Sequence, residues 1–211
     1  MKRLAKNRIP EVMSILEEMH PEAMCALDHR GSFELLVAVV LSAQTTDVSV
    51  NKVTPELFRK YPDPASLAAA DQADVMDTIK TIGLYRNKSA NIIKLAQKLT
   101  QDYDGIVPSD FDELVKLPGV GRKTANVVMA EAFGKPAIAV DTHVFRVANR
   151  IGLTDADDVN RTEDQLKDRL PEDQWIRAHH LLIFHGRKVC HARKPDCEAC
   201  GLNEICLGVK K

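Results

Sequence analysis

Hydrophobic residues recur every three or four positions along most of the chain, which is the period of an amphipathic α-helix. Near the N-terminus, Pro10 suits the first turn of a helix, and Val12, Ile15 or Leu16, and Met19 continue an apolar stripe. No stretch sustains the polar–apolar alternation that is typical of a half-buried strand. The pattern therefore predicts an all-α fold.

Two segments stand out from this general pattern. Residues 33–41 are apolar on every side, which predicts a helix buried in the middle of the molecule. Residues 142–151 carry a narrow apolar stripe, with Asp141 as a favourable N-cap and Gly152 as a stop. Further helices are expected at 47–60, 64–70, 71–81, 88–100, from Ser109 and Asp112 to Leu117, from Asn160 and Glu163 onward, and at 172–185.

Composition places the chain among ordinary globular proteins. Of its 211 residues, 45% are hydrophobic and 28% are charged, enough for one large domain or two small ones. The longest uncharged apolar run, 35–41, is too short to span a bilayer, and no apolar core follows the basic N-terminus as in a secretory signal. A cytoplasmic location is expected.

The net charge of −1 argues by itself against a nucleic-acid partner, but the charge is unevenly distributed. Residues 116–150 contain six basic and two acidic residues, whereas 155–173 contain eight acidic and three basic residues. The near-neutral total thus hides a basic stretch beside an acidic one. Because solvated helix faces produce the same pattern, charge alone predicts no partner.

The stretch LPGVGRKTANVV, residues 117–128, predicts a tight turn between two helices. Pro118 ends the first helix, and Gly119 and Gly121 can adopt positive φ, so the chain can reverse within a few residues. The second helix is expected to begin near Arg122. Open N–H groups at such a helix start bind anions, and they can hold a phosphodiester without reading the base sequence.

Lys123 follows this turn in the first helical turn, and Asp141 is the expected cap of a later helix. An amine near a helix N-terminus and other cations loses its proton more readily and can act as a nucleophile. A carboxylate can stabilise positive charge or relay protons. The segment KSANII at 88–93 echoes KTANVV, but Lys88 lacks the preceding Gly-Val-Gly turn, so no anion site is expected there.

Four cysteines near the C-terminus, Cys190, Cys197, Cys200 and Cys206, form a C-x6-C-x2-C-x5-C pattern. Disulfides are rare in cytoplasmic proteins, so the pattern predicts a zinc ion or an iron–sulfur cluster. Structural zinc commonly uses two C-x2-C turns, and this segment has one, which favours the cluster. The fifth cysteine, Cys25, is expected in the core.

The loop HARKPD between the first two of these cysteines carries Arg193 and Lys194. With a metal ligand at each end, the loop would be rigid and basic and could bind a second phosphate. An ordinary solvated surface loop is the alternative interpretation.

The motifs LPGVGRKTANVV and AVDTHVFRVANR and the cysteine pattern occur in this order over the full chain. Together they make the chain resemble the endonuclease III family of bacterial helix-hairpin-helix DNA glycosylases. The resemblance implies a six-helix barrel domain at 24–135 that contains the hairpin. It also implies a second helical domain, made of 1–23 and 136–211, whose four cysteines hold a [4Fe-4S] cluster.

The same resemblance implies a base-excision-repair enzyme that is both a DNA glycosylase and an abasic-site lyase. Lys123 would attack C1′ of a damaged nucleotide flipped out of the duplex, and Asp141 would assist base departure and proton transfer. The resulting Schiff base allows β-elimination, which cuts the strand 3′ to the lesion. The implied partner is double-stranded DNA with oxidised pyrimidines or abasic sites, and the implied enzyme is a nucleoid-associated monomer without a membrane partner.

DNA contacts also follow from the resemblance. Gln44 would fill the gap left by the flipped base, and Leu84 would wedge into the base stack, although a turn residue and a packing residue are the alternatives. The remaining candidate DNA-binding residues are Gly119, Val120, Gly121, Arg122, His143, Arg193 and Lys194.

Two other functions fit parts of the sequence. A monofunctional glycosylase, such as the adenine-removing relative, lacks the lysine at the position of Lys123. A non-catalytic iron–sulfur protein that binds DNA or senses redox state would keep the hairpin and the cysteines but would not need Lys123 and Asp141 together.

Overall fold

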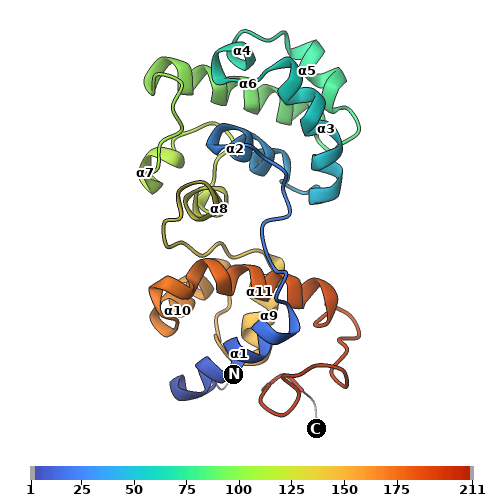
Figure 1. Cartoon of the computed structure of the whole chain (residues 1–211), viewed down its shortest axis with the longest axis vertical. Coiled ribbons are helices and arrows are strands. Elements are labelled where there is room, and N and C mark those ends of the chain that lie inside the picture. Colours follow the sequence, from blue (N-terminus) through green and yellow to red (C-terminus); the bar gives the residue numbers. More distant parts are fainter. Residues whose placement is uncertain (1–2, 210–211) are drawn as a thin grey trace. The chain divides into compact units, whose positions relative to one another are not determined.

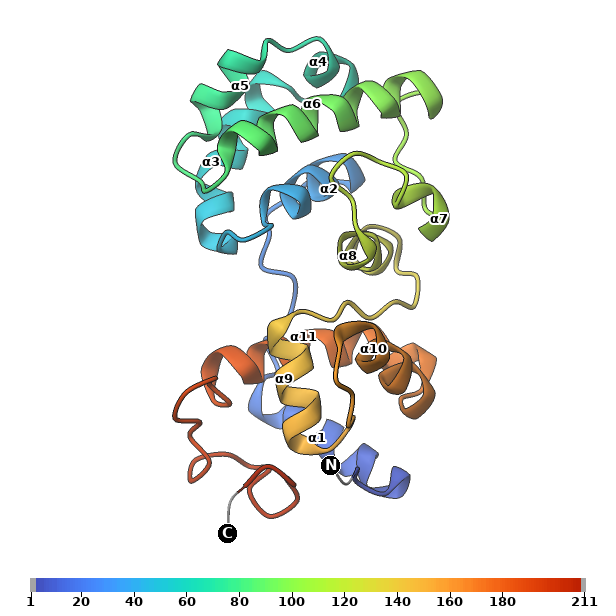
Figure 2. The ribbon, with the colours of Figure 1, turned by 180° about the vertical axis from the view of Figure 1, so that it is seen from behind.

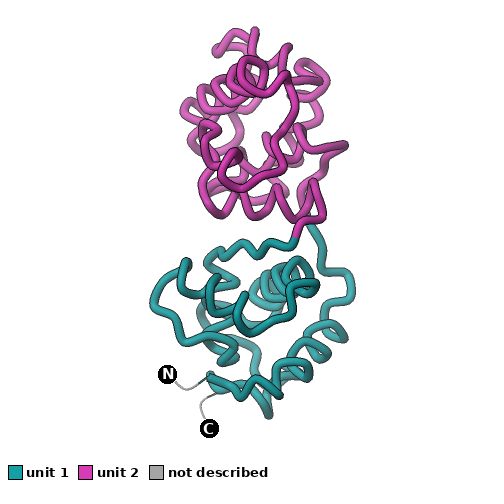
Figure 3. Tube along the Cα trace, turned by 90° about the vertical axis from the view of Figure 1, so that its left-hand side faces the viewer, with its two compact units in different colours: residues 1–25, 136–211 teal, residues 26–135 magenta. Residues whose placement is uncertain are grey.

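The computed structural model describes residues 3–209, and every regular element in this range is helical (Figure 1). The predicted all-α fold is therefore confirmed. The chain forms two compact units: the hairpin unit, Ala26–Lys135, and the cysteine unit, Met1–Cys25 with Pro136–Lys211 (Figure 3). None of the helices within the described range is long and apolar enough to cross a membrane.

The hairpin unit is built around one buried helix, α2 (Ser32–Leu41). Residues 35–41 are all buried, as the apolar run predicted, and α2 packs against three other helices of the unit. Those partners are α3 (Asp47–Lys60), α6 (Tyr85–Asp102) and α8 (Arg122–Phe133). The smaller helices of the unit are α4 (Pro64–Ala68), α5 (Gln72–Ile79) and α7 (Phe111–Leu114).

Two helix starts differ from the sequence-based expectation. Asp110, rather than Ser109, caps α7, because its carboxylate accepts hydrogen bonds from two backbone N–H groups of the first turn. Ser109 instead accepts hydrogen bonds from the Lys135 ammonium. Likewise Asp158, rather than Asn160, caps α10 (Val159–Arg169). In each case an aspartate stands one or two residues from the expected cap and offers the stronger, charged acceptor.

Other boundaries differ by about one helical turn or less. The helix expected at 88–100 begins earlier and ends later, as α6, and the short helix expected from Ser109 ends at Leu114 instead of Leu117. The segment expected as one helix at 172–185 is a 3₁₀ turn, η2 (Glu172–Gln174), that continues into α11 (Trp175–Lys188).

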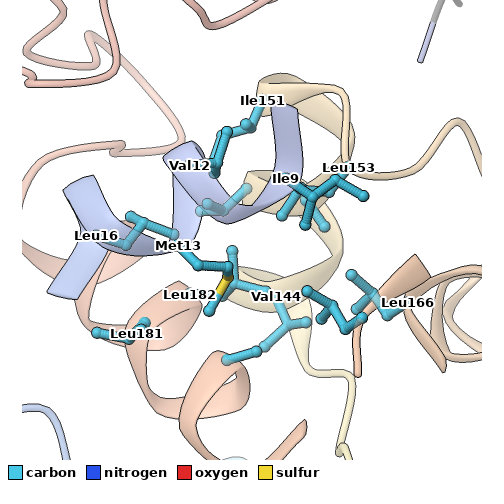
Figure 4. Close-up of a cluster of buried hydrophobic side chains, with 14 of the residues drawn as sticks. Ile9, Val12, Met13, Leu16, Val144, Ile151, Leu153, Leu166, Leu181 and Leu182 are labelled. Carbon is cyan, nitrogen blue, oxygen red and sulfur yellow. The ribbon is translucent and has the colours of Figure 1, made fainter. Parts of the chain in front are cut away.

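The cysteine unit packs an N-terminal helix against two helices from the C-terminal half. After the short turn η1 (Lys6–Arg8), α1 (Ile9–Met19) lies against α9 (Thr142–Ile151) and α11 (Figure 2). Their shared core is formed by Ile9, Val12, Met13, Leu16, Val144, Ile151, Leu181 and Leu182 (Figure 4).

Two expectations about buried residues, at Ile15 or Leu16 and at Cys25, can be compared with the structure. Leu16, and not Ile15, continues the α1 stripe, because Leu16 is fully buried, like Val12, and Ile15 is only partly buried. The expectation that Cys25 is a core residue is wrong, because this residue is only half-buried in the connection between the units. Leu202 and Ile205, which follow the third cysteine, belong to the core and tie the C-terminal segment to it.

Gly152 ends α9 at a point where both ends of the cysteine unit meet. Its φ is +93°, a left-handed conformation that favours glycine. Its carbonyl accepts a hydrogen bond from Leu4 N–H at 2.8 Å, and the preceding Ile151 carbonyl accepts one from Leu207 N–H at 3.2 Å. A Cβ atom at Gly152 would lie 2.6 Å from Leu207 Cδ1.

We therefore expect Gly152→Ala to lower the free energy of unfolding by more than the roughly 1–2 kcal/mol that a left-handed alanine costs. The added methyl group must also displace Leu207 and disturb the contact with Leu4. Urea denaturation followed by circular dichroism measures the change. Gly105→Ala is the matched control, because Gly105 has φ +76° and open space around its Cα. Equal losses in the two variants would contradict the close-packing argument.

Candidate functional site

The predicted hairpin lies between α7 and α8 (Figure 1). Leu117 and Val120 are buried, and Val120 N–H donates to the Leu117 carbonyl at 3.1 Å, which closes the turn. Gly119 has φ +79°, and a Cβ there would lie 3.2 Å from Val40 Cγ1 on α2. Glycine is thus needed at this position both for its conformation and for the space it leaves.

Gly121 differs from the expectation that both glycines adopt positive φ. Its φ is −98° in extended backbone, which any residue can adopt, and a Cβ there would meet no described atom within 4 Å. The protein's own packing therefore does not require glycine at Gly121. The missing side chain instead leaves open space at the start of α8.

The first turn of α8 is open and basic. Its N-cap, Gly121, supplies no capping side chain, so the start of the helix has room for an anion. Arg122 and Lys123 are the first two residues of the helix, and both are exposed. The Arg122 guanidinium lies 5.7 Å from the centre of the Phe111 ring. Lys123 forms no hydrogen bond or ion pair with any residue between 3 and 209.

Asp141 caps α9 in the other unit. Its Oδ1 atom accepts hydrogen bonds from the backbone N–H groups of His143 and Val144, both at 2.8 Å. These two bonds fix the orientation of the half-buried carboxylate. The second oxygen, Oδ2, accepts no hydrogen bond within the described part of the chain. The cap that the sequence predicted is present, and it leaves one carboxylate oxygen available for chemistry.

His143 stands beside this cap. Burial lowers the pKa of its imidazole below the ordinary value, so the ring is neutral near pH 7. Its Nδ1 lies 3.2 Å from the Arg146 guanidinium, and the ring is also hydrogen-bonded to the Gly186 backbone. These contacts hold the imidazole close to Asp141.

Gln44 and Leu84 lie on two adjacent loops of the hairpin unit. Both side chains are exposed, Leu84 to 56%, and both residues have left-handed φ, +54° and +59°. A Cβ placed on Gly83 would lie 4.0 Å from the Gln44 carbonyl and 3.9 Å from the Thr45 hydroxyl. Left-handed conformations at non-glycine residues are unfavourable and cluster at functional sites. The two sequence-predicted DNA contacts are thus near each other.

The cysteine segment that follows α11 contains no helix or strand between residues 189 and 209. Cys190, Cys197, Cys200 and Cys206 line one hollow together with apolar side chains. No group of three or more His, Cys, Asp or Glu residues between 3 and 209 is arranged to hold a metal ion. A single zinc ion requires thiols within about 2.3 Å of one point. The four cysteines nevertheless line one common hollow, as ligands of one shared metal group should.

The chemistry of the thiols fits the same interpretation. Burial raises the pKa of Cys200 and Cys206, and the neighbouring thiols raise it further. Thiolates at this site are therefore unfavourable without a positive partner. Iron ions bind thiolates and supply positive charge, so a cluster would stabilise the thiolates, which the protein alone does not.

Two arginines of α9 hold the backbone of the cysteine segment. Arg146 donates to the carbonyls of Gly186 and Cys190 at 2.9 and 3.0 Å. Arg150 donates to the carbonyls of His191 and Ala192 at 2.6 and 2.9 Å. The following residues, Arg193 and Lys194, are both exposed, and Lys194 has φ +53°. The basic loop is therefore held at its base and presents its charges outward.

A buried histidine pair also contacts this segment. His185 Nε2 lies 3.6 Å from Cys200 Sγ, and its Nδ1 lies 3.1 Å from His20 Nε2. Burial lowers the pKa of His185 to about 4, so the ring is neutral near pH 7. If Cys200 is a thiolate, His185 Nε2 must donate to it and His185 Nδ1 must accept from His20. His20 Nδ1 is then a buried acceptor, which has no partner in the described structure.

Sequence reasoning missed the residues that support the site. Arg146, Arg150, His20 and His185 were not singled out, because their partners are backbone carbonyls or side chains far away in sequence. Lys88 could have been recognised from the sequence, because its helical spacing places it on the same apolar face as the buried residues of α6.

Comparison with known proteins agrees with these observations. Residues 37–172 match the model of the HhH-GPD superfamily of base excision DNA repair proteins. Residues 190–206 match the iron–sulfur binding domain of endonuclease III. The chain therefore carries a [4Fe-4S] cluster, as the cysteine pattern and the family resemblance predicted.

Individual relatives are similar over nearly the full length. Endonuclease III of Bacillus subtilis is 53% identical, covering 90% of this chain and 87% of the relative. The Escherichia coli K12 protein is 46% identical, covering 93% of each. A solved structure described as a trapped endonuclease III–DNA covalent intermediate has a TM-score of 0.92 at 50% identity, covering 97% of both chains. A thermostable thymine-DNA glycosylase has a TM-score of 0.86 at 27% identity, covering 96% of both chains.

Because Arg150 holds the segment that carries the cysteines, we expect Arg150→Met to weaken cluster retention about 10- to 100-fold, as loss of outer contacts does at other metal sites. Decay of the visible iron–sulfur absorption in the presence of an iron chelator measures this. Arg161→Met is the matched control, because Arg161 pairs with Asp157 on an exposed face of α10. Equal decay rates in wild type and Arg150→Met would show that these hydrogen bonds do not hold the segment.

Proposed function

The chain belongs to the endonuclease III family within the HhH-GPD superfamily of base excision DNA repair proteins, and we propose that it is a bifunctional DNA glycosylase and abasic-site lyase. Its substrates are oxidised pyrimidines and abasic sites in double-stranded DNA. One observation carries the proposal: Lys123 is exposed in a helix turn without a side-chain cap, and it forms no hydrogen bond or ion pair with residues 3–209.

That placement supplies a nucleophile at a phosphate-binding surface. The open N–H groups of α8 favour a DNA phosphate, which brings the neighbouring sugar towards Lys123. A relative that is 50% identical has been solved as a trapped covalent intermediate with DNA, and a covalent intermediate requires such a nucleophile. The monofunctional and the non-catalytic alternatives leave Lys123 without a role.

The reaction then proceeds in two stages. The neutral Lys123 amine attacks C1′ of a nucleotide flipped out of the duplex, the bond from C1′ to the base breaks, and the base leaves with the bonding pair and takes up a proton. Ring opening gives a Schiff base between Nζ and C1′. Loss of a proton from C2′ then expels the 3′ phosphate from C3′, which cuts the strand 3′ to the lesion.

Asp141 serves the steps at the sugar. Its Oδ1 atom is occupied by the cap of α9, so Oδ2 stabilises positive charge at C1′ and moves protons. His143, held in place by Arg146 and the Gly186 backbone, contacts the DNA backbone beside it. Asp141 thus has two roles, because it caps α9 through Oδ1 and orients Oδ2 for the reaction.

The hairpin and the cysteine segment bind the DNA backbone. Backbone N–H groups at 119–121 and the first turn of α8 bind one phosphate, which approaches closely because Gly121 has no side chain. Arg122 adds a positive charge to this contact. Arg193 and Lys194 bind a second phosphate from the loop that Arg150 holds.

Gln44 and Leu84 act at the base stack. Leu84, a large apolar side chain exposed to 56%, wedges between bases, and Gln44 occupies the gap left by the flipped nucleotide. Their adjacent loops and left-handed backbones support this pair of roles.

Cys190, Cys197, Cys200 and Cys206 are the ligands that hold the [4Fe-4S] cluster. With four cysteine ligands, the cluster supplies a structural anchor for the C-terminal segment rather than an open metal position. Residues 24–135 then form the hairpin domain, and 1–23 with 136–211 form the cluster domain. We place the enzyme in the cytoplasm, on the nucleoid, as a monomer.

Borohydride trapping on a duplex with one thymine glycol or one abasic site tests this function. Borohydride reduces a Schiff base to a stable adduct, so we expect a covalent adduct with the wild type and none with Lys123→Ala. Lys98→Ala is the matched control, because Lys98 is a half-exposed lysine paired with Asp102 on α6, and its adduct should equal that of the wild type.

Asp141→Asn should slow base release about 10²- to 10⁴-fold, the range typical of lost acid–base catalysis, while duplex binding persists. Single-turnover release of thymine glycol and a gel-shift measurement give the two values. Wild type that binds the duplex but forms no adduct would instead indicate a monofunctional glycosylase or a non-catalytic cluster protein.

A further inference from the structure

Lys88 is a buried cation on the apolar face of α6. It is only 4% exposed, and Ile92, Leu95 and Leu99 continue the same buried face. Its ammonium donates one hydrogen bond, to the Thr45 hydroxyl, and it forms no ion pair with a carboxylate of residues 3–209. Burial lowers its pKa. A buried ammonium with no counter-ion is unfavourable, and an apolar residue of similar volume would be more favourable. Lys88 therefore needs an explanation other than stability.

The hydrogen bond of Lys88 joins two loops that are far apart in sequence. Thr45 directly follows Gln44, in the loop that leads into α3. Lys88 lies one helical turn after Leu84, and its own N–H donates to the Leu84 carbonyl at 3.0 Å. The turn before α6 lies beside α3 in Figure 2, in agreement with the approach of Gly83 to Thr45. One side chain thus connects the loop of Gln44 with the helix start at Leu84.

Both connected loops hold an unfavourable backbone. Gln44 and Leu84 have left-handed φ, which persists only where the surroundings impose it. The Leu84 N-cap of α6 makes no side-chain capping bond. No other side chain hydrogen bond links residues 42–46 to residues 82–88 in the described structure. The contact between Lys88 and Thr45 is therefore the specific polar link that can set the spacing of the two exposed side chains.

We propose that Lys88 is a positioning residue that holds Gln44 and Leu84 at a fixed spacing through Thr45, so that both enter the base stack together when the nucleotide is flipped. This inference rests on the proposed roles of Gln44 and Leu84. The residue acts through these two side chains and does not touch the reacting atoms. Its effect belongs to nucleotide flipping and not to the chemistry at C1′.

Lys88→Met tests the proposal, because it keeps the volume of the side chain and removes the donor. Thr45→Val removes the acceptor without burying a new charge, and Thr45→Ser keeps the hydroxyl. We expect Lys88→Met and Thr45→Val to slow thymine glycol release from a duplex about 10- to 100-fold, as small misplacements of positioning groups do. Thr45→Ser should retain the wild-type rate, and the double variant should be no slower than either single variant.

A second substrate separates flipping from chemistry. An abasic site in a single-stranded oligonucleotide has no opposing base to replace and no duplex stack to open, so borohydride trapping there should be the same in all variants and the wild type. Fluorescence of 2-aminopurine next to the lesion reports flipping directly. This fluorescence is measured with the Lys123→Ala variant, which breaks no bond. It should rise less on DNA binding when Lys88→Met is added to that variant than with Lys123→Ala alone.

Three results would overturn the proposal. One is an unchanged duplex rate in both Lys88→Met and Thr45→Val. Another is an equal loss on the duplex and the single strand, together with a lower melting temperature, which would make the contact merely structural. The third is unchanged 2-aminopurine fluorescence.

A failure of one variant to fold, or of the lyase function itself, can be told apart from a failure of the proposal. If Lys88→Met does not fold, Thr45→Val alone tests the role of the hydrogen bond. Absence of any trapped adduct with the wild type would contradict the lyase function, while the fluorescence measurement would still decide the role of Lys88. Lys98→Met is the matched control, because Lys98 lies on the same helix, is half-exposed and pairs with Asp102.

Discussion

The hydrogen bonds from two arginines of α9 to the backbone of the cysteine segment are the constraint on which the cysteine unit depends. That segment has no helix or strand between residues 189 and 209, and Arg146 and Arg150 satisfy the carbonyls of Cys190, His191 and Ala192. The same helix begins at Asp141 and ends at Gly152, where the N-terminal and C-terminal segments meet. One helix of ten residues therefore orients a carboxylate at its start, holds a cysteine segment along its length and joins the chain ends at its finish.

The hairpin unit is organised around the buried helix α2. A side chain at Gly119 would crowd Val40 on α2 and would need an unfavourable left-handed φ, which couples the core of the unit to the shape of the hairpin turn. Gly121, two residues on, has no such neighbour and leaves open space. The first glycine therefore serves the fold, and the second leaves room for a ligand. A substitution at either position changes the hairpin for a different physical reason.

Two buried polar arrangements connect distant parts of the chain. Lys88 is buried against one hydroxyl, and the His20–His185 pair reaches from α1 to the sulfur of Cys200. Each arrangement takes a titratable group out of water and shifts its pKa towards the neutral form. Each also joins segments more than forty residues apart. Buried polar groups with few partners define geometry, since they tolerate few alternative positions.

The sequence by itself determined the features that depend on residues close together in the chain, namely the helices and most of their ends. Periodicity predicted an all-helical fold and the buried helix at 33–41, and local capping chemistry placed Asp141 and Gly152 at the two ends of α9. Helix starts with two capping candidates, at Ser109 and Asn160, were assigned wrongly, because the choice between adjacent acceptors depends on the exact backbone path. The tertiary structure alone decided which side chains meet from distant segments. Lys88 with Thr45, Arg150 with the cysteine loop, and His185 with Cys200 are such pairs, because side-chain hydrogen bonds between remote segments leave no periodic trace in the sequence.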